Sequence, residues 1–192
     1  MCGIAGIWGS VEDGRLADMI GLQRHRGPDG RGTSLRPGHG GLGHTRLAIM
    51  DPGGGQQPIH NEDRSATVVA NGMIYNHPQL RRRLERAHDF GSDSDSETIL
   101  HLFEEQGLAT PRLLDGMFAF AVATDERLFL ARDYIGIKPL YYAHPANSDW
   151  PLYFASELKA LEPLGMAVHE LSLIHISEPT RQLTQSRIPS YA

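Results

Sequence analysis

The sequence predicts an α+β fold in which two β-sheets pack against each other between layers of helices. Short apolar segments separated by loops dominate the 192 residues, and 21 of these residues are glycine. Segments with the helical spacing of apolar residues are fewer, and an excess of strands over helices is typical of layered α+β domains. Strands are expected at residues 2–8, 32–35, 41–49, 66–74, 116–124, 127–132, 139–143 and 151–155.

The helix expected at residues 95–106 has the clearest start signal. Ser94 and Glu97 have the spacing of a capping box, in which the first side chain caps the helix and the second bonds back to the first residue. Apolar Ile99 and Phe103 follow at helical spacing. Further helices are expected at residues 15–23, 78–87 and 156–161.

The composition fits a folded domain that binds neither nucleic acid nor membranes. Hydrophobic residues make up 40% of the chain and charged residues 21%, which is ordinary for a protein with a buried core. The net charge of -5 opposes contact with nucleic-acid phosphates, and Glu85 interrupts the one basic cluster at residues 81–86. No apolar run approaches the roughly 20 residues that span a bilayer, and the start lacks the basic region of a signal peptide. We therefore expect a cytoplasmic protein.

The cysteine and histidine content argues against disulfide and metal chemistry. Because Cys2 is the only cysteine, the chain can form no internal disulfide and no cysteine-rich zinc site. The ten histidines are scattered, and none belongs to an HExxH motif or a similar pair on an expected helix. The sequence therefore predicts no metal site.

The position of Cys2 indicates a nucleophile, although a lone cysteine is more often a small buried hydrophobic residue. Removal of Met1, which the small residues Cys2 and Gly3 favour, would place a thiol and a free α-amine on the same residue. An α-amine has a pKa of about 7.7–8.0, so it is partly neutral at cellular pH and accepts a proton. It would then act as a general base attached to its own nucleophile.

A cysteine nucleophile needs donors that stabilise an oxyanion, and Asn71 and Gly72 are candidates. The Asn71 side chain carries an amide donor, and Gly72 leaves its backbone N–H open to close approach. The alternative is that Asn-Gly forms a type I′ hairpin turn, which this dipeptide favours. Taken alone, the two residues favour the turn.

An amino-acid substrate also needs partners for its α-carboxylate and α-ammonium groups. Arg46 can bind a carboxylate with both arms of its guanidinium, and Asp95 can accept an ammonium. Each residue has an alternative explanation. Arg46 could be an ordinary arginine on a strand face, and Asp95 an acid that stabilises the start of a helix.

Together these residues resemble the glutaminase domain of the class II, or N-terminal nucleophile, glutamine amidotransferases. Within that family they are most similar to the asparagine synthetase branch, and the resemblance covers about residues 1–165. The motifs that carry it are MCGIAG (1–6), RHRGPDG (24–30), HTRLAIMD (44–51), GQQPI (55–59), NGMIYNH (71–77), SDSETIL (94–100), LDGMFAFA (114–121), RDYIGIKPLYY (132–142) and FASELKAL (154–161).

The resemblance implies a four-layer α/β/β/α sandwich and hydrolysis of L-glutamine to glutamate and ammonia. It implies that Cys2 is both nucleophile and base, and that Asn71 and Gly72 form the oxyanion hole. A different amidotransferase of the same group, or a catalytically silent ligand-binding module, remains an alternative.

The resemblance also implies substrate-binding roles. Arg46 would bind the glutamine carboxylate, Asp95 the amino group, and the RGPDG loop containing Gly27 would shape the pocket. Met73 departs from the pattern, because many members of the asparagine synthetase branch carry glutamate there. We expect this change to weaken glutamine binding without inactivating the site.

The resemblance defines a glutaminase domain at residues 1–168. Residues 169–192 match no recognisable domain, and we expect them to be a disordered or non-native tail. The synthetase domain that follows in the family is absent from this sequence. ATP and Mg²⁺ are therefore implied only for that missing domain, none is expected here, and a homodimer of the full-length chain stays open.

Overall fold

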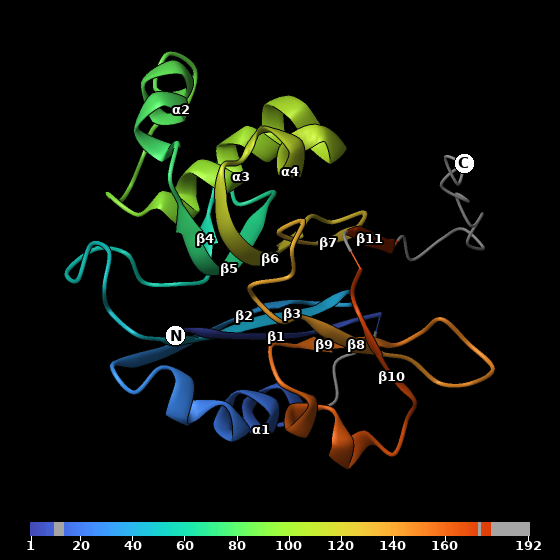
Figure 1. Ribbon diagram of the computed structural model, residues 1–192. Coiled ribbons are helices and arrows are strands. Elements are labelled where there is room, and N and C mark those ends of the chain that lie inside the picture. The colour runs from blue at the N-terminus through green and yellow to red at the C-terminus, as the bar shows by residue number, and fades with distance from the viewer. Residues whose placement is uncertain (10–13, 173, 178–192) are drawn as a thin grey trace.

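The computed structural model describes residues 1–9, 14–172 and 174–177. Two antiparallel sheets lie face to face, with helices covering both outer faces (Figure 1). The six-stranded sheet has the order β10-β8-β9-β1-β3-β2. Its strands are β1 (Gly3–Trp8), β2 (Gly30–Arg36), β3 (Gly40–Arg46), β8 (Tyr141–Ala143), β9 (Leu152–Ala155) and β10 (Val168–Glu170).

The second sheet has five strands in the order β11-β7-β6-β5-β4, and all its pairings are antiparallel. The long antiparallel pair of β5 and β6 forms its centre, with eight paired positions from Thr67↔Ala123 to Ile74↔Gly116. The strands are β4 (Ile59–His60), β5 (Thr67–Ile74), β6 (Gly116–Ala123), β7 (Leu128–Arg132) and β11 (Ile174–Ser177).

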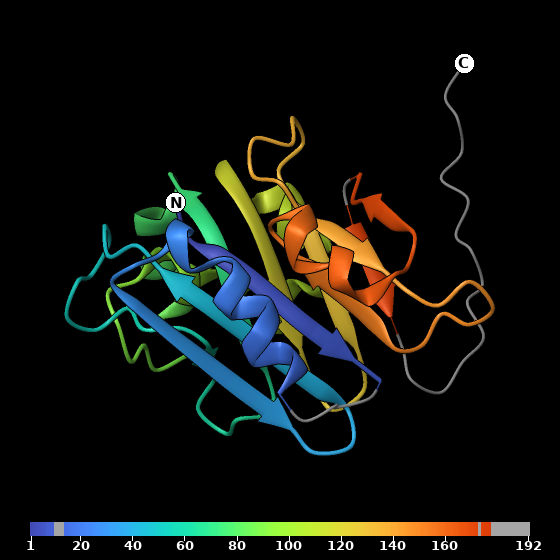
Figure 2. The ribbon, with the colours of Figure 1, turned by 90° about the horizontal axis from the view of Figure 1, so that it is seen from below.

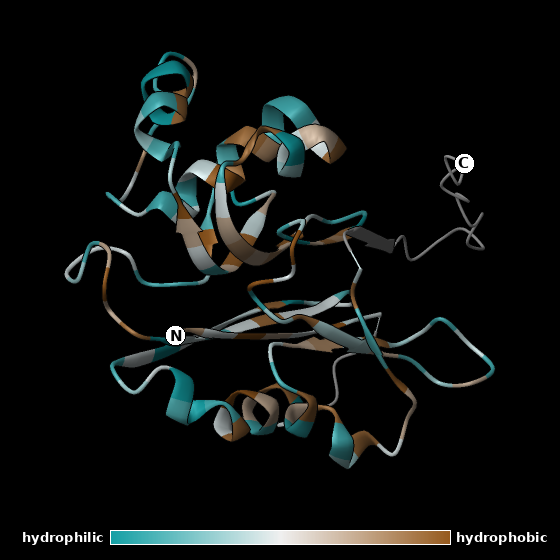
Figure 3. Ribbon diagram, viewed as in Figure 1, coloured by the Kyte–Doolittle hydropathy of each residue, from teal (hydrophilic) through white to brown (hydrophobic). Residues whose placement is uncertain are grey.

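Helices form the two outer layers. Seen from below, α1 (Arg15–Leu22) lies across β1 and β3 of the six-stranded sheet (Figure 2). Helix α3 (Asp95–Gln106) packs on β5 of the other sheet, and the mostly hydrophilic α2 (His77–Leu84) packs on α3 (Figure 3). A short α4 (Thr110–Leu113) and four 3₁₀ turns complete the set: η1 (Arg24–Arg26), η2 (Gly107–Ala109), η3 (Leu158–Ala160) and η4 (Glu162–Leu164).

Three buried hydrophobic clusters hold the four layers together. Strand β6 contributes to two of these clusters, because its successive side chains point to opposite faces of the sheet. Ala119 and Ala121 face the other sheet, where large residues such as Trp8 fill the space, while Phe118 and Phe120 face α3. A third cluster packs α1 against β1 and β9 through residues that include Leu16, Met19, Ile20, Ile7 and Tyr153.

These layers confirm the predicted α/β/β/α sandwich, and most expected elements lie within a few residues of their predicted bounds. The strand expected at 41–49 ends at Arg46, because its pairing with β1 and β2 ends there. The capping box is only half formed. The Ser94 side chain caps α3 as predicted, but Glu97 accepts hydrogen bonds from the Gly91 and Ser92 backbone instead of that of Ser94.

The sheets continue past residue 168, where we expected the domain to end. Strand β10 pairs with β8, the side chain of Leu171 is buried between the sheets, and the backbone of β11 pairs with β7. Residues 173 and 178–192 of the expected tail lie outside the described residues. Within the described part of the chain, no helix has the length and apolar character required to cross a bilayer.

Candidate active site

A cavity of about 190 Å³ opens beside the start of β1, between the two sheets. Five of the six predicted site residues line it, although they come from four separate parts of the chain. They are Cys2, Arg46, Asn71, Gly72 and Asp95.

Gly27 is the exception and does not line this cavity. A side chain at this position would collide with the β3 backbone, since a Cβ would lie 2.3 Å from the Arg46 nitrogen. The next residue, Pro28, forms a bridge with Arg46, and Asp29 donates a backbone hydrogen bond to the Arg46 carbonyl oxygen. Gly27 therefore lets the RGPDG loop lie directly against the strand that carries Arg46.

Cys2 is half-buried, and both its thiol and its backbone are held in place. The Sγ atom accepts a hydrogen bond from the Leu47 backbone N–H at 3.4 Å. The Arg26 Nε donates to the Cys2 carbonyl oxygen at 2.9 Å, and Arg26 Nη1 pairs with Glu157 at 2.9 Å. Glu157 thus fixes Arg26, and Arg26 fixes the backbone of Cys2.

The Glu157 carboxylate is strongly stabilised in its ionised form. Burial alone would raise its pKa, but hydrogen bonds from Arg26, His25 and Lys159 outweigh burial and lower the pKa from 4.5 to about 2. A lowered pKa in the folded state contributes stability above pH 4.5 that is lost as the pH falls towards 2.

We expect Glu157→Gln to lower the free energy of unfolding by about 1–3 kcal/mol at pH 7, because the partly exposed ion pairs are screened. The difference from the parent chain should shrink as the pH is lowered towards 3. Chemical denaturation at several pH values measures both quantities. Glu126→Gln is the matched control, since the Glu126 side chain is 81% exposed. A difference in the free energy of unfolding that stays constant with pH would contradict this account of Glu157.

The free edge of β5 presents three backbone amides in a row towards the cavity. Strand β4 pairs only with Thr67 and Val68, so this edge is open further along β5. The Ala70 N–H donates to the Gln57 side chain at 2.6 Å, and the Ile74 N–H donates to Asp95 at 2.8 Å.

The backbone N–H of Gly72 lies between those of Ala70 and Ile74, which already donate to side chains. Its cross-strand partner Phe118 directs its own N–H and C=O to Asp133, so the two strands do not exchange hydrogen bonds at this pair. The Gly72 N–H therefore points to the same open edge as those of Ala70 and Ile74. Glycine is required here, because a Cβ would lie 2.3 Å from the Met117 carbonyl oxygen.

Asn71 supplies a second free donor. Its side-chain Nδ2 is buried and has no hydrogen-bond partner among the described residues. A buried amide donor without a partner costs free energy, so it is expected to bind a ligand atom. Asn71 and Gly72 lie within the strand rather than in a turn, so the hairpin-turn alternative is wrong.

Arg46 is buried at the end of β3, and its guanidinium organises the following loop. It donates hydrogen bonds to the carbonyl oxygens of Met50, Asp51 and Pro52. A guanidinium has five N–H donors, so these three hydrogen bonds do not use all of them, and Arg46 also lines the cavity. Arg46 is thus an anchor for the 50–52 segment as well as a cation in the cavity wall.

Asp95 is the first residue of α3 and is 4% exposed. Burial raises its pKa, although hydrogen bonds from backbone groups such as the Ile74 N–H oppose that rise. An ammonium ion placed beside this carboxylate would stabilise its ionised form. Asp95 therefore lies at the start of α3, where an acid stabilises the helix, and also lines the cavity, where its carboxylate can accept hydrogen bonds from a ligand.

The cavity also contains polar residues that the sequence did not single out. Lys138 is buried and its Nζ lies 3.4 Å from the Met1 sulfur, beside Cys2. His44 lies in the wall, and mainly burial lowers its pKa to about 4, so the imidazole is neutral at pH 7. Met73, the departure from the expected glutamate, lines the cavity as well.

Comparisons with curated sequences identify close relatives. The chain is 44% identical over 168 residues to asparagine synthetase [glutamine-hydrolyzing] 3 of Arabidopsis thaliana, and 43% identical over 168 residues to asparagine synthetase [glutamine-hydrolyzing] of Zea mays. Each alignment covers 84% of this chain and 28% of the relative. The chain thus spans under a third of the length of these relatives.

Solved structures share the fold at lower sequence identity. The glutamine phosphoribosylpyrophosphate amidotransferase of B. subtilis, complexed with ADP and GMP, superposes with a TM-score of 0.76 at 22% identity, over 95% of this chain and 50% of that chain. A structure described as the allosteric regulatory enzyme of purine biosynthesis gives a TM-score of 0.73 at 23% identity over the same shares.

The family comparison covers nearly the whole sequence. The description of the matching family is glutamine amidotransferase domain, and the match extends over residues 1–187. This range contains all the residues that line the cavity. The chain therefore belongs to the glutamine amidotransferase domain family.

Proposed function

We propose that this chain hydrolyses the side-chain amide of L-glutamine through a thioester on Cys2. The observation that carries the proposal is the convergence of three groups on one cavity: the Cys2 thiol, the unpartnered Asn71 amide and the free Gly72 N–H. Arg46 and Asp95 line the same cavity and supply opposite charges for the two ends of an amino acid.

In the first half of the reaction, the α-amine of Cys2 accepts the thiol proton and Sγ attacks the δ-carbon of glutamine. The carbonyl oxygen becomes an oxyanion that receives hydrogen bonds from Asn71 and Gly72. The α-ammonium then returns its proton to the leaving nitrogen, and ammonia departs. In the second half, water attacks the thioester, which yields glutamate and regenerates the thiol.

This mechanism requires removal of Met1. Met1 lines the cavity beside Cys2, and its sulfur accepts a hydrogen bond from Lys138. Its loss would free the α-amine and enlarge the cavity on the side of Lys138.

The ammonia acceptor is proposed from the relatives. Their printed names describe glutamine-hydrolysing asparagine synthetases, so we propose that this chain is the ammonia-supplying part of such an enzyme. An exposed apolar loop supports a second domain as partner. Tyr134 and Ile135 are 87% and 81% exposed, close to the buried Lys138 of the cavity wall.

The proposal is tested by ammonia release from L-glutamine by the chain with and without Met1. A bulky residue inserted between Met1 and Cys2 should retain the methionine, which mass spectrometry checks. We expect activity only when Cys2 is the first residue. Equal ammonia release by both forms would overturn the role of the α-amine as the base.

We expect Arg46→Ala to raise the KM for glutamine roughly 30–150-fold, because a charge-assisted pair contributes about 2–3 kcal/mol. Steady-state kinetics with glutamine as the varied substrate measure this change. Arg46→Lys retains the charge but not the paired N–H donors, and should give an intermediate KM. The melting temperature of each variant shows whether the raised KM comes from lost glutamine binding, which leaves it unchanged, or from loosening of the 50–52 segment, which lowers it. An unchanged KM in Arg46→Ala would remove Arg46 from the substrate site.

A further inference from the structure

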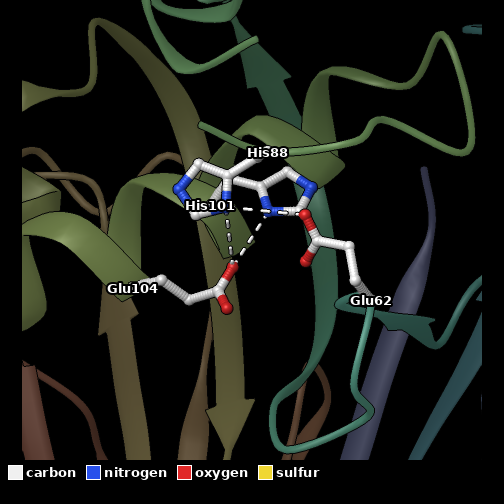
Figure 4. Close-up of side chains that lie close together, drawn as sticks. All are labelled: Glu62, His88, His101 and Glu104. Carbon is white, nitrogen blue, oxygen red and sulfur yellow. Dashed lines mark hydrogen bonds and ion pairs between the residues drawn. The ribbon is translucent and has the colours of Figure 1, made fainter. Parts of the chain in front are cut away.

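Two histidines and two glutamates meet on the outer side of the five-stranded sheet, away from the cavity wall. His101 and Glu104 lie one turn apart on α3, His88 belongs to the segment between α2 and α3, and Glu62 follows β4 (Figure 4). One possible metal-ligand atom from each residue lies within 4.8 Å of the others. None of these residues has a part in the proposed glutaminase reaction.

The spacing of these atoms approaches that of a tetrahedral ion site. Ligand atoms about 2.0–2.2 Å from zinc lie about 3.3–3.6 Å from one another at tetrahedral angles. Glu104 Oε2 is 2.9 Å from His101 Nδ1 and 3.7 Å from His88 Nδ1. Glu62 Oε1 is 3.6 Å from His88 Nδ1. These three separations differ by a few tenths of an ångström from tetrahedral values, and every other pair of the four atoms lies within 4.8 Å.

Both imidazoles are oriented as metal-bound histidines usually are. Each directs Nδ1 to the centre of the group, and each directs Nε2 to another carboxylate outside it. His101 Nε2 lies 3.7 Å from Glu97, and His88 Nε2 lies 3.8 Å from Glu105. Neither carboxylate is within hydrogen-bond distance of the ring, and His101 Nε2 has no hydrogen-bond partner among the described residues. Each carboxylate nevertheless places negative charge beside the nitrogen that would not bind the ion, the position that outer-shell carboxylates take in metal sites.

The two inner carboxylates are also held from outside. Asn61 Nδ2 donates to Glu104 Oε1 at 2.6 Å, and this leaves Oε2 directed at the histidines. The Asp89 N–H donates to Glu62 Oε1 at 2.8 Å. These two hydrogen bonds come from residues that would not bind the ion themselves. They hold both carboxylates in place, as outer-shell partners do in metal sites.

The charge and accessibility of the cluster suit a cation. Four carboxylates face the two histidines, namely Glu62, Glu97, Glu104 and Glu105, while Arg83 pairs with Glu105 at 3.6 Å. The Glu62 and Glu104 side chains are 39% and 24% exposed. An ion can therefore reach the centre from solvent, although the His101 side chain is only 1% exposed.

We infer that Glu62, His88, His101 and Glu104 bind one divalent transition-metal ion, with zinc as the best match. Two imidazole nitrogens with two carboxylates favour zinc over magnesium or calcium, which prefer oxygen ligands alone. The bound ion would join three segments that are far apart in the sequence: the turn after β4, the segment after α2, and α3. Its function is structural, because four protein ligands leave no open position for a substrate.

The inference is tested by titrating metal-stripped chain with Zn²⁺ alone. The Cys2→Ala background removes the thiol as a competing ligand. Isothermal titration calorimetry should show one ion per chain, and the melting temperature should rise with zinc concentration. Co²⁺ bound in place of zinc should give the visible absorption of a tetrahedral nitrogen and oxygen site.

His88→Gln and Glu104→Gln should raise the zinc Kd more than about 100-fold, and Glu105→Gln should raise it about 10–100-fold through His88. Glu85→Gln is the matched control, because it removes a carboxylate three residues before His88 in the sequence that pairs with Arg81 instead. Its Kd should match that of the parent.

Far-UV circular dichroism and the melting temperature without metal show whether each variant folds. Three results would overturn the inference: no saturable binding by the folded parent, equal affinity in His88→Gln and Glu85→Gln, or a Co²⁺ spectrum of an octahedral water-rich ion.

Discussion

Cys2→Ala should abolish ammonia release from L-glutamine, with a fall in kcat on the order of 10⁴-fold or more. The α-amine would remain after removal of Met1, but it would have no thiol to deprotonate. The donors at Asn71 and Gly72 would still face the cavity, yet without a nucleophile they have no oxyanion to stabilise. Ammonia release at saturating glutamine measures the effect.

Glutamine should still bind to the Cys2→Ala chain, because the charged residues that hold its two ends are unchanged. Isothermal titration calorimetry with L-glutamine tests this second expectation. Cys2→Ser is a closer match in shape, and its less acidic hydroxyl should also give a large loss of kcat. Ammonia release by Cys2→Ala at the parent rate would disprove the thioester mechanism.

Asn71→Ala should lower kcat by about 10²–10³-fold and leave the KM for glutamine almost unchanged. The Asn71 amide would strengthen its hydrogen bond only as the carbonyl oxygen becomes charged, so its loss affects the transition state more than substrate binding. Steady-state kinetics separate kcat from KM.

The melting temperature distinguishes this role from a structural one. Because Asn71 Nδ2 has no partner among the described residues, its removal should cost little stability. Phe118→Ala is the matched control on the paired strand, since it empties core volume and should lower the melting temperature. A destabilised Asn71→Ala chain with a raised KM would indicate that Asn71 supports the strand and not the oxyanion.

Sequence alone could predict the elements, the layers and most of the ligand-facing residues. Local patterns were sufficient for α3, whose cap at Ser94 is encoded within a few residues, and for β6, whose alternation of alanine and phenylalanine reports two buried faces. Asn71 was different, because its dipeptide with Gly72 taken alone favours a turn. Only its position inside β5, paired along its length with the distant strand β6, decided the matter.

The rest depended on contacts between distant parts of the chain. Among the described residues, β4 pairs only with Thr67 and Val68 and does not reach Gly72, and strand length is poorly encoded by local propensity. Lys138 reaches the cavity from a loop more than 130 residues after Cys2, so no spacing rule connects them. The four side chains of the proposed metal site likewise come from three segments, so no spacing motif in the sequence indicates them.

The unpaired stretch of β5 has a consequence for solubility. An open strand edge can recruit a strand from another molecule, and proteins usually cover such edges. Here the Gln57 and Asp95 side chains accept hydrogen bonds from the Ala70 and Ile74 backbone amides, on either side of Gly72. Only the Gly72 amide between them is left for an incoming group. An incoming strand needs several amides in succession, whereas an oxyanion needs one. The same two side chains therefore admit a small ligand and oppose the pairing of another strand with this edge.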